Sequence, residues 1–127
     1  MLTEEVAEAI EEIRAQFAPC AVDHDEDGAG GAYVIVREIE LGSPYIQGAT
    51  DLGFHLAFQY PEADVYPLYV LPSLERQDGA PLGESLTPTS WRGAPAIQVS
   101  RRSNQRDPAV DTAALKALKV LTWLRER

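Results

Sequence analysis

The fold is decided by AYVIVREIEL (residues 32–41) and, after a short connection, LGFHLAFQY (residues 52–60). Both segments are rich in β-branched or aromatic residues and alternate apolar with polar positions, a pattern typical of half-buried strands. In the second segment one face is apolar and is formed by Leu52, Phe54, Leu56 and Phe58. His55 and Gln59 fall on the opposite face, so we expect them to lie toward solvent or a covering element.

Shorter extended pieces flank these two strands. Residues 20–22 lead into an acidic, glycine-rich stretch at 23–31, which is typical of a turn or exposed loop. Residues 66–71 (YPLYVL) form a short fourth strand that ends at Pro72. Because the connections are short, a four-stranded antiparallel meander is the simplest arrangement.

A helix is expected at each end of the chain. Residues 3–17 begin with Thr3 as a plausible N-cap, and apolar residues recur at helical spacing while glutamates occupy the other faces. The last helix is expected to begin with Asp107 as N-cap and Pro108 at its first position. Its apolar face would carry Leu115, Leu118, Leu121 and Leu124.

Residues 73–95 have no clear periodicity and are interrupted by several prolines and glycines, so they are expected to form a long irregular loop. Residues 96–99 are expected to add one short extended piece. The expected fold is therefore α+β: an N-terminal helix, a four-stranded antiparallel β-meander, a long loop and a C-terminal helix. A length of 127 residues fits one domain, 1–127.

Charge is unevenly distributed along the chain. Residues 1–90 carry 17 acidic and 3 basic side chains, whereas residues 91–127 carry 8 basic and 3 acidic ones. The acidic body would repel nucleic acid, so we expect no nucleic-acid partner. The apolar stretches are too short for a membrane span, and the acidic N-terminus does not resemble a signal peptide. With a single cysteine, Cys20, no intramolecular disulfide forms, and a cytoplasmic location is expected.

The element order and the segment YPEADVYP (residues 60–67) resemble the ubiquitin-conjugating-enzyme-like (UBC-like) superfamily, which includes the non-catalytic RWD and UEV domains. Members of that superfamily open with a helix, continue through a four-stranded meander and carry a Tyr/Phe-Pro…Pro element around the fourth strand. The segment SRRS (residues 100–103) and the last helix look most like divergent bacterial members. These are often encoded beside ubiquitin-like modifiers, activating enzymes and deubiquitinase-like peptidases, so the resemblance implies a role in a bacterial ubiquitin-like conjugation or defence system.

The sequence departs from the catalytic members of that superfamily. They carry a thioester cysteine after the fourth strand, preceded by a His-Pro-Asn element. Residues 73–106 contain no Cys or His and only one asparagine, Asn104, which follows the expected place. Ser85 and Ser90 do not replace a thiolate. We therefore expect a non-catalytic binding module with no cofactor, which engages a modifier, an activating-enzyme-like protein or a conjugating enzyme.

Two surfaces are candidates for partner binding, and each has a structural alternative. The first is the acidic side of the N-terminal helix, represented by Glu4, Glu8 and Glu11; related domains contact activating enzymes through this helix, but it could equally be a solvated face. The second combines an aromatic residue with arginines, which are enriched at interface centres. It consists of Trp91, Arg92, Arg101, Arg102 and Arg106. These arginines could instead neutralise the domain's own acids.

Other chemistry has weaker support in the sequence. Cys20 is best interpreted as a small buried hydrophobe. Asp23, Asp25, Asp27 and Gly28 match the first half of a calcium loop, but position twelve is Val34 rather than Glu, so an acidic turn is the better interpretation. With two histidines and one cysteine there is no zinc pattern, and no metal site is expected.

Two further functions stay open. One is an unusual catalytic conjugating enzyme of the same fold, or an unrelated α+β enzyme with its site in the 73–95 loop. The other is an acidic immunity- or chaperone-type protein that masks a basic partner, with binding that weakens at high salt.

Overall fold

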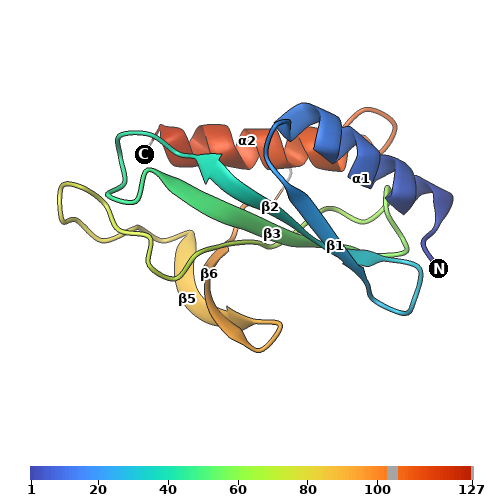
Figure 1. Ribbon diagram of the computed structural model, residues 1–127, viewed down its shortest axis with the longest axis horizontal. Coiled ribbons are helices and arrows are strands. Elements are labelled where there is room, and N and C mark those ends of the chain that lie inside the picture. Colours follow the sequence, from blue (N-terminus) through green and yellow to red (C-terminus); the bar gives the residue numbers. More distant parts are fainter. Residues whose placement is uncertain (103–105, 127) are drawn as a thin grey trace.

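The computed structural model describes residues 1–102 and 106–126. Along these described residues, one helix precedes six strands and a second helix follows them (Figure 1). The elements are α1 (Glu4–Phe17), β1 (Val22–Glu26), β2 (Ala32–Glu40), β3 (Ala49–Leu56), β4 (Leu68–Val70), β5 (Leu86–Trp91), β6 (Ala94–Val99) and α2 (Ala113–Arg125).

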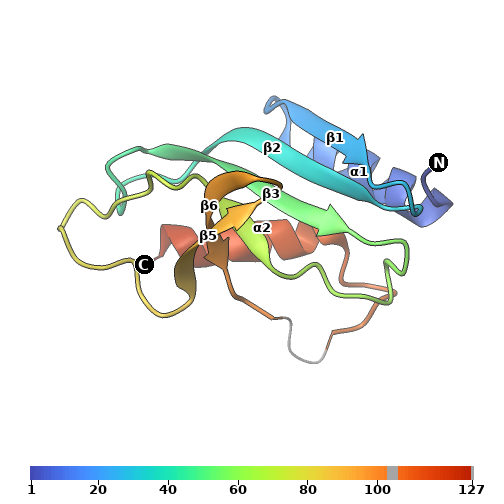
Figure 2. The same ribbon diagram turned by 90° about the horizontal axis from the view of Figure 1, so that it is seen from below.

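The six strands form one antiparallel sheet in the order β1-β2-β3-β4-β6-β5. Both helices cover the same face of this sheet (Figure 1). The β5–β6 hairpin curls beneath the opposite face, as the view from below also shows (Figure 2). The molecule is thus a two-layer α+β structure with one sheet face covered by helices and the other covered only in part by the hairpin.

The core lies between the helices and the covered sheet face. Alternate residues of the central strands point into it, and the apolar stripe of each helix meets them. Its largest fully buried side chains include Ile10, Ile13, Phe54, Leu52, Leu121 and Leu124. Tyr45 is also buried, and its hydroxyl donates a hydrogen bond of 2.9 Å to the carbonyl of Leu124. No helix within residues 1–102 and 106–126 has the length and apolar character needed to cross a bilayer.

The expected N-terminal helix is confirmed. The Oγ1 atom of Thr3 accepts a hydrogen bond of 3.1 Å from the main-chain N–H of Val6, which makes Thr3 the N-cap. The apolar residues that recur at helical spacing, Val6, Ile10, Ile13 and Phe17, are buried together with Ala9. The meander β1-β2-β3-β4 also follows the expected order, and residues 96–99 belong to β6 as expected.

The expectation of four strands is wrong, because the sheet has six. The region predicted to be a long loop, 73–95, contains β5 and the start of β6. β5 is an edge strand with mostly exposed side chains, so it shows no apolar alternation, and Pro88 is tolerated in it for the same reason. The acidic stretch predicted to be a loop, 23–31, begins instead as strand β1.

The start of the last helix also differs from the prediction. Asp107 caps a separate turn, accepting a hydrogen bond of 3.0 Å from the N–H of Ala109. α2 begins only at Ala113, with Thr112 as N-cap. The predicted apolar face is displaced slightly as well: Leu121 and Leu124 are buried, but Leu115 is 39% exposed. Phe58, expected on the apolar face of the second strand, lies beyond the end of β3 and is 53% exposed.

Candidate functional site on the open face of the sheet

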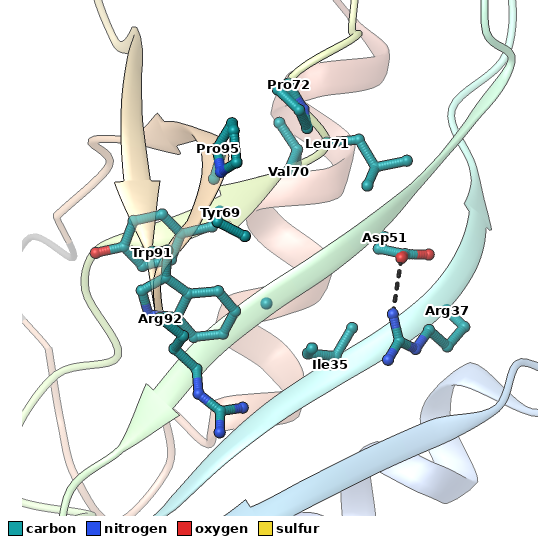
Figure 3. Close-up of a pocket in the computed structure, with 13 residues that line it drawn as sticks. Ile35, Arg37, Asp51, Tyr69, Val70, Leu71, Pro72, Trp91, Arg92 and Pro95 are labelled. Carbon is teal, nitrogen blue, oxygen red and sulfur yellow. Dashed lines mark hydrogen bonds and ion pairs between the residues drawn. The ribbon is translucent and has the colours of Figure 1, made fainter.

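The β5–β6 hairpin turns within two residues, Arg92 and Gly93, which both have positive φ (53° and 81°). Two consecutive left-handed residues make the tight turn that matches the twist of paired strands, and glycine at the second position favours it. The turn leaves Trp91 paired with Ala94 at the tip of the hairpin. From this position the indole ring reaches back over the open face of the sheet (Figure 3).

Trp91 is seated on Gly53 in the centre of β3. A Cβ atom at Gly53 would lie 2.3 Å from Cζ3 of the indole, so only glycine lets the ring approach this closely. The same ring stacks on Tyr69 of β4, with centroids 4.7 Å apart and planes 12° from parallel. These two contacts hold the hairpin tip against the sheet.

A row of interacting side chains continues from Trp91 across β2 and β3. Trp91 and Tyr33 form an edge-to-face pair with centroids 6.3 Å apart, and Tyr33 stacks on His55 at 4.6 Å. Nε2 of His55 lies 2.7 Å from Oδ2 of Asp27, and this hydrogen bond is the main reason that the pKa of Asp27 is lowered. His55 therefore lies on the open face, as predicted, where Tyr33 and Asp27 hold its ring.

Between Trp91 and the far part of β2 the open face is hollowed into a groove of about 280 Å³ (Figure 3). The walls are mainly apolar and include Ile35, Leu71, Pro72, Trp91 and Pro95. We call this the hairpin groove. Leu71 in its wall is 39% exposed, so part of the apolar surface is open to solvent.

The charged side chains that line the hairpin groove, Arg37, Asp51 and Arg92, are already in ion pairs. Arg37 donates hydrogen bonds to Asp23 at 2.9 Å and to Asp51 at 3.0 Å. These two carboxylates, Asp23 first, raise the pKa of the Arg37 guanidinium. At the other end, the Arg92 guanidinium lies 4.4 Å above the ring of Tyr33 and pairs with a carboxylate of β1 at 3.1 Å. The groove therefore has an apolar floor between two occupied ion pairs.

The predicted surface of one tryptophan and four arginines is divided by the structure. Trp91 and Arg92 lie together at the hairpin tip, whereas Arg101 and Arg102 follow the other end of β6, roughly 17 Å away at ~3.4 Å per residue. Arg106 is only 11% exposed at its side chain, and it donates hydrogen bonds to the main-chain carbonyls at positions 61 and 62. Arg106 is therefore an internal support rather than part of an exposed surface.

The alternative that the arginines neutralise the chain's own acids holds for two of them. Arg92 pairs with Asp25, and Arg106 lies 3.5 Å from Asp64. Within the described residues, none of the predicted arginines pairs with a glutamate of α1. Their partners come from β1 and from the segment before β4.

The acidic residues of α1 lie on the opposite side of the molecule from the hairpin groove. Glu4, Glu8 and Glu11 are exposed along the helix, and Glu11 pairs with Arg14 of the next turn at 2.8 Å. Because α1 covers the other sheet face (Figure 1), a partner seated in the hairpin groove would not also contact this stripe without wrapping around the domain.

Two further sequence hypotheses are clarified by the structure. Cys20 is half-buried against the core, with Sγ 3.9 Å from the carbonyl oxygen of Glu38. The three aspartates that suggested a calcium loop do not converge, because two of them lie along β1 and all three have basic partners. Within the described residues there is no group of three or more His, Cys, Asp or Glu side chains that would hold a metal ion.

Sequence reasoning missed several residues of the groove, among them Gly53, Tyr69 and Leu71. One signal was present: a glycine interrupts the alternation of the strand 52–60, and glycine inside a strand often marks close approach of another group. The identity of the approaching group was not visible, because Trp91 is 38 positions away in the chain.

Comparison of the chain with protein-family models, with curated proteins and with solved structures finds no match.

Proposed function

We propose that this protein is a non-catalytic, UBC-like binding module that engages a protein partner in a bacterial ubiquitin-like conjugation or defence system. The order of helix, antiparallel meander and C-terminal helix is compatible with that family resemblance. The only thiol, Cys20, lies between α1 and β1 and is packed against the core, far in sequence from the segment that follows β4. Transfer of a modifier through a thioester therefore has no support at the family's usual place.

The observation that carries the proposal is the hairpin groove. An apolar hollow of about 280 Å³ beside a half-exposed tryptophan has the composition of an interface centre. Its charged side chains are already ion-paired, so the groove offers burial of apolar surface rather than new charge contacts. The occupant is accordingly an apolar side chain on the surface of the partner, which packs against Trp91 and Leu71.

The experiment is affinity purification of the tagged protein from its own host, without reductant, followed by mass spectrometry. Two matched charge variants are run beside the wild type. Leu71→Arg places a charge in the wall of the hairpin groove at an exposed position, and Glu8→Lys reverses a charge on the opposite side of the molecule. Both positions are exposed, so neither change should disturb the fold.

The proposal predicts that a ubiquitin-like modifier, an activating-enzyme-like protein or a conjugating enzyme is recovered with the wild type and with Glu8→Lys, but is lost with Leu71→Arg. Recovery of such a protein with all three forms would refute the groove as its binding site. A reductant-sensitive adduct on Cys20 would refute the non-catalytic assignment and favour an unusual conjugating enzyme.

A second candidate function rests on the exposed acidic face of α1. This face carries five glutamates, Glu4, Glu5, Glu8, Glu11 and Glu12, and suits a basic partner that the domain masks. Masking predicts recovery of a basic protein that is released at high salt and that is lost with Glu8→Lys but retained with Leu71→Arg.

A further inference from the structure

A second cavity lies beside α2 and has the opposite character from the rest of this acidic chain. It measures about 160 Å³. Four cationic side chains and one carboxylate contribute to its lining, together with Val120 and Trp123. The charged residues are Arg101, Arg102, Lys116, Lys119 and Asp111. In a chain of net charge −9, this is a local concentration of positive charge. We call it the basic cavity.

Aromatic rings hold both arginines of the basic cavity. The guanidinium of Arg101 lies 4.7 Å above the ring of Trp123, and that of Arg102 lies 4.0 Å above the ring of Tyr66. Stacking uses the flat face of the guanidinium and leaves its N–H groups, which lie at the edge, able to donate. Both arginines are exposed, so a ligand from solvent has access to them.

These two arginines differ from the others in their acceptors. Arg37, Arg92 and Arg106 each pair with a carboxylate. By contrast, within residues 1–102 and 106–126 neither Arg101 nor Arg102 has an ion pair or an acceptor for its guanidinium. Two guanidinium groups thus line the basic cavity without an anionic partner among the described residues.

The lysines add to the field in the basic cavity. Lys116 is 7% exposed and pairs with Asp64 at 3.2 Å, and Lys119 lies 3.6 Å from Asp111. Burial lowers the pKa of the Lys116 ammonium, because removal from water disfavours its charged form. An anion bound near Lys116, in addition to Asp64, would stabilise that charged form. The basic cavity therefore favours a negatively charged occupant more than its two arginines alone would.

We propose that the basic cavity binds an oxyanion, a phosphate or carboxylate group, through the N–H edges of Arg101 and Arg102. Its volume of about 160 Å³ equals roughly five waters at ~30 Å³ each, which suits a single oxyanion group. Two planar guanidinium groups provide the paired donors that such oxygens accept. This inference does not depend on the hairpin groove, which lies at the other end of β6.

The test is a titration of the ¹⁵N-labelled full chain, followed by NMR, with inorganic phosphate and separately with acetate at constant ionic strength. The reporters are the indole N–H of Trp123 and the side-chain Nε–H signals of the arginines. We expect saturable shifts with at least one of the two anions. Arg101→Gln and Arg102→Gln should each weaken binding at least tenfold, or about 1.4 kcal/mol.

Arg92→Gln is the matched control, because Arg92 also covers an aromatic ring but is ion-paired with Asp25. It should leave the affinity unchanged. Should either arginine variant of the cavity fail to fold, Lys119→Gln replaces it, since the Lys119 side chain is 72% exposed, and it should weaken binding measurably.

Saturation by phosphate alone would assign the site to phosphate groups, by acetate alone to carboxylates, and by both to oxyanions in general. Two results would overturn the proposal. One is a set of shifts that grow linearly and match those produced by chloride. The other is an equal loss of affinity in Arg92→Gln and in the cavity variants, which would show only the general effect of removing positive charge.

Discussion

Replacing Gly53 by alanine should displace Trp91 from the sheet and destabilise the protein, although alanine is normally the better residue inside a strand. The new Cβ atom would lie 2.3 Å from Cζ3 of the indole, whereas ordinary contact begins at 3.4 Å. The ring must therefore move by about 1.1 Å, the difference between these two distances. Such a movement disturbs the stacked contact between Trp91 and Tyr69 and changes the shape of the hairpin groove.

Two opposing free-energy changes determine the size of the effect. Overpacking at a close contact costs about 1–3 kcal/mol. Alanine returns about 0.4–1 kcal/mol, because it lowers the conformational entropy of the unfolded chain and Gly53 has no left-handed backbone that only glycine tolerates. The expected net loss of stability is about 1 kcal/mol.

A double-mutant cycle with Trp91→Ala separates these two changes. Without the indole, a Cβ atom at Gly53 meets no ring, so alanine there should stabilise by about 0.4–1 kcal/mol. The sign of the Gly53→Ala effect should thus reverse, with a coupling energy of about 1–3 kcal/mol. Urea unfolding followed by far-ultraviolet circular dichroism measures all four forms without relying on tryptophan fluorescence. An equal loss in both backgrounds would refute the seating of Trp91 on Gly53.

Three further predictions concern single side chains. The buried Tyr60 hydroxyl accepts a 3.0 Å hydrogen bond from the first main-chain N–H of α2. Tyr60→Phe should therefore lower the free energy of unfolding by about 1–3 kcal/mol, as measured by thermal unfolding. An unchanged melting temperature would contradict this role. The pKa of Asp27 is lowered, chiefly by its hydrogen bond to His55. The ionised carboxylate therefore stabilises the fold fully at a pH above the unfolded-state pKa of about 3.9. This stabilisation is lost as the pH falls through the lower folded-state pKa. Asp27→Asn should therefore lose less stability than the wild type between pH 5 and pH 2 in urea titrations, and parallel losses would refute the assignment. Arg106→Gln should lower the free energy of unfolding by about 1.5–3 kcal/mol, because it removes charged hydrogen bonds to main-chain carbonyls. Arg102→Gln, at an exposed position, should change it by no more than ~0.5 kcal/mol. Equal effects would mean that both arginines are structural.

The elements that were predicted correctly are those whose signals are local. α1 combines an N-cap with an apolar stripe at helical spacing, and both lie within 15 residues. The central strands β2 and β3 alternate because one face is buried under the helices. In these segments the sequence neighbours of each residue were sufficient to indicate its environment.

The elements that were missed are stabilised by partners far away in the chain. The sequence of β1 indicates an acidic loop because its carboxylates are neutralised only in the folded protein. On the open face, Arg37 pairs with Asp23 from 14 residues further along the chain, and Arg92 pairs with Asp25 from 67 residues further along. β5 reads as irregular because an edge strand with exposed side chains has no apolar period. At α2, Asp107 and Pro108 resemble a helix start but belong to a turn that precedes the true N-cap, Thr112.

The candidate site could be predicted only in part for the same reason. Trp91 and Arg92 were recognised as interface-type residues from their composition, but their position depends on Gly53, whose role appears only when the hairpin folds over the sheet. Of the segment SRRS (residues 100–103), the last serine lies outside the described residues, as does Asn104.

The arginines of this chain show how a fold separates structural charge from charge available for binding. Arg92, Arg101 and Arg102 look alike in the sequence, and each guanidinium carbon lies 4.0–4.7 Å from the centroid of an aromatic ring. They differ in whether a carboxylate of the chain reaches the donor edge: Asp25 reaches Arg92, and in the described part of the chain none reaches the other two. Within residues 1–102 and 106–126 every other arginine donates to a carboxylate or to a main-chain carbonyl, so these two guanidinium groups are the exception, and they line the same cavity. We therefore expect the acidic group that pairs with these two arginines to belong to a ligand or a partner.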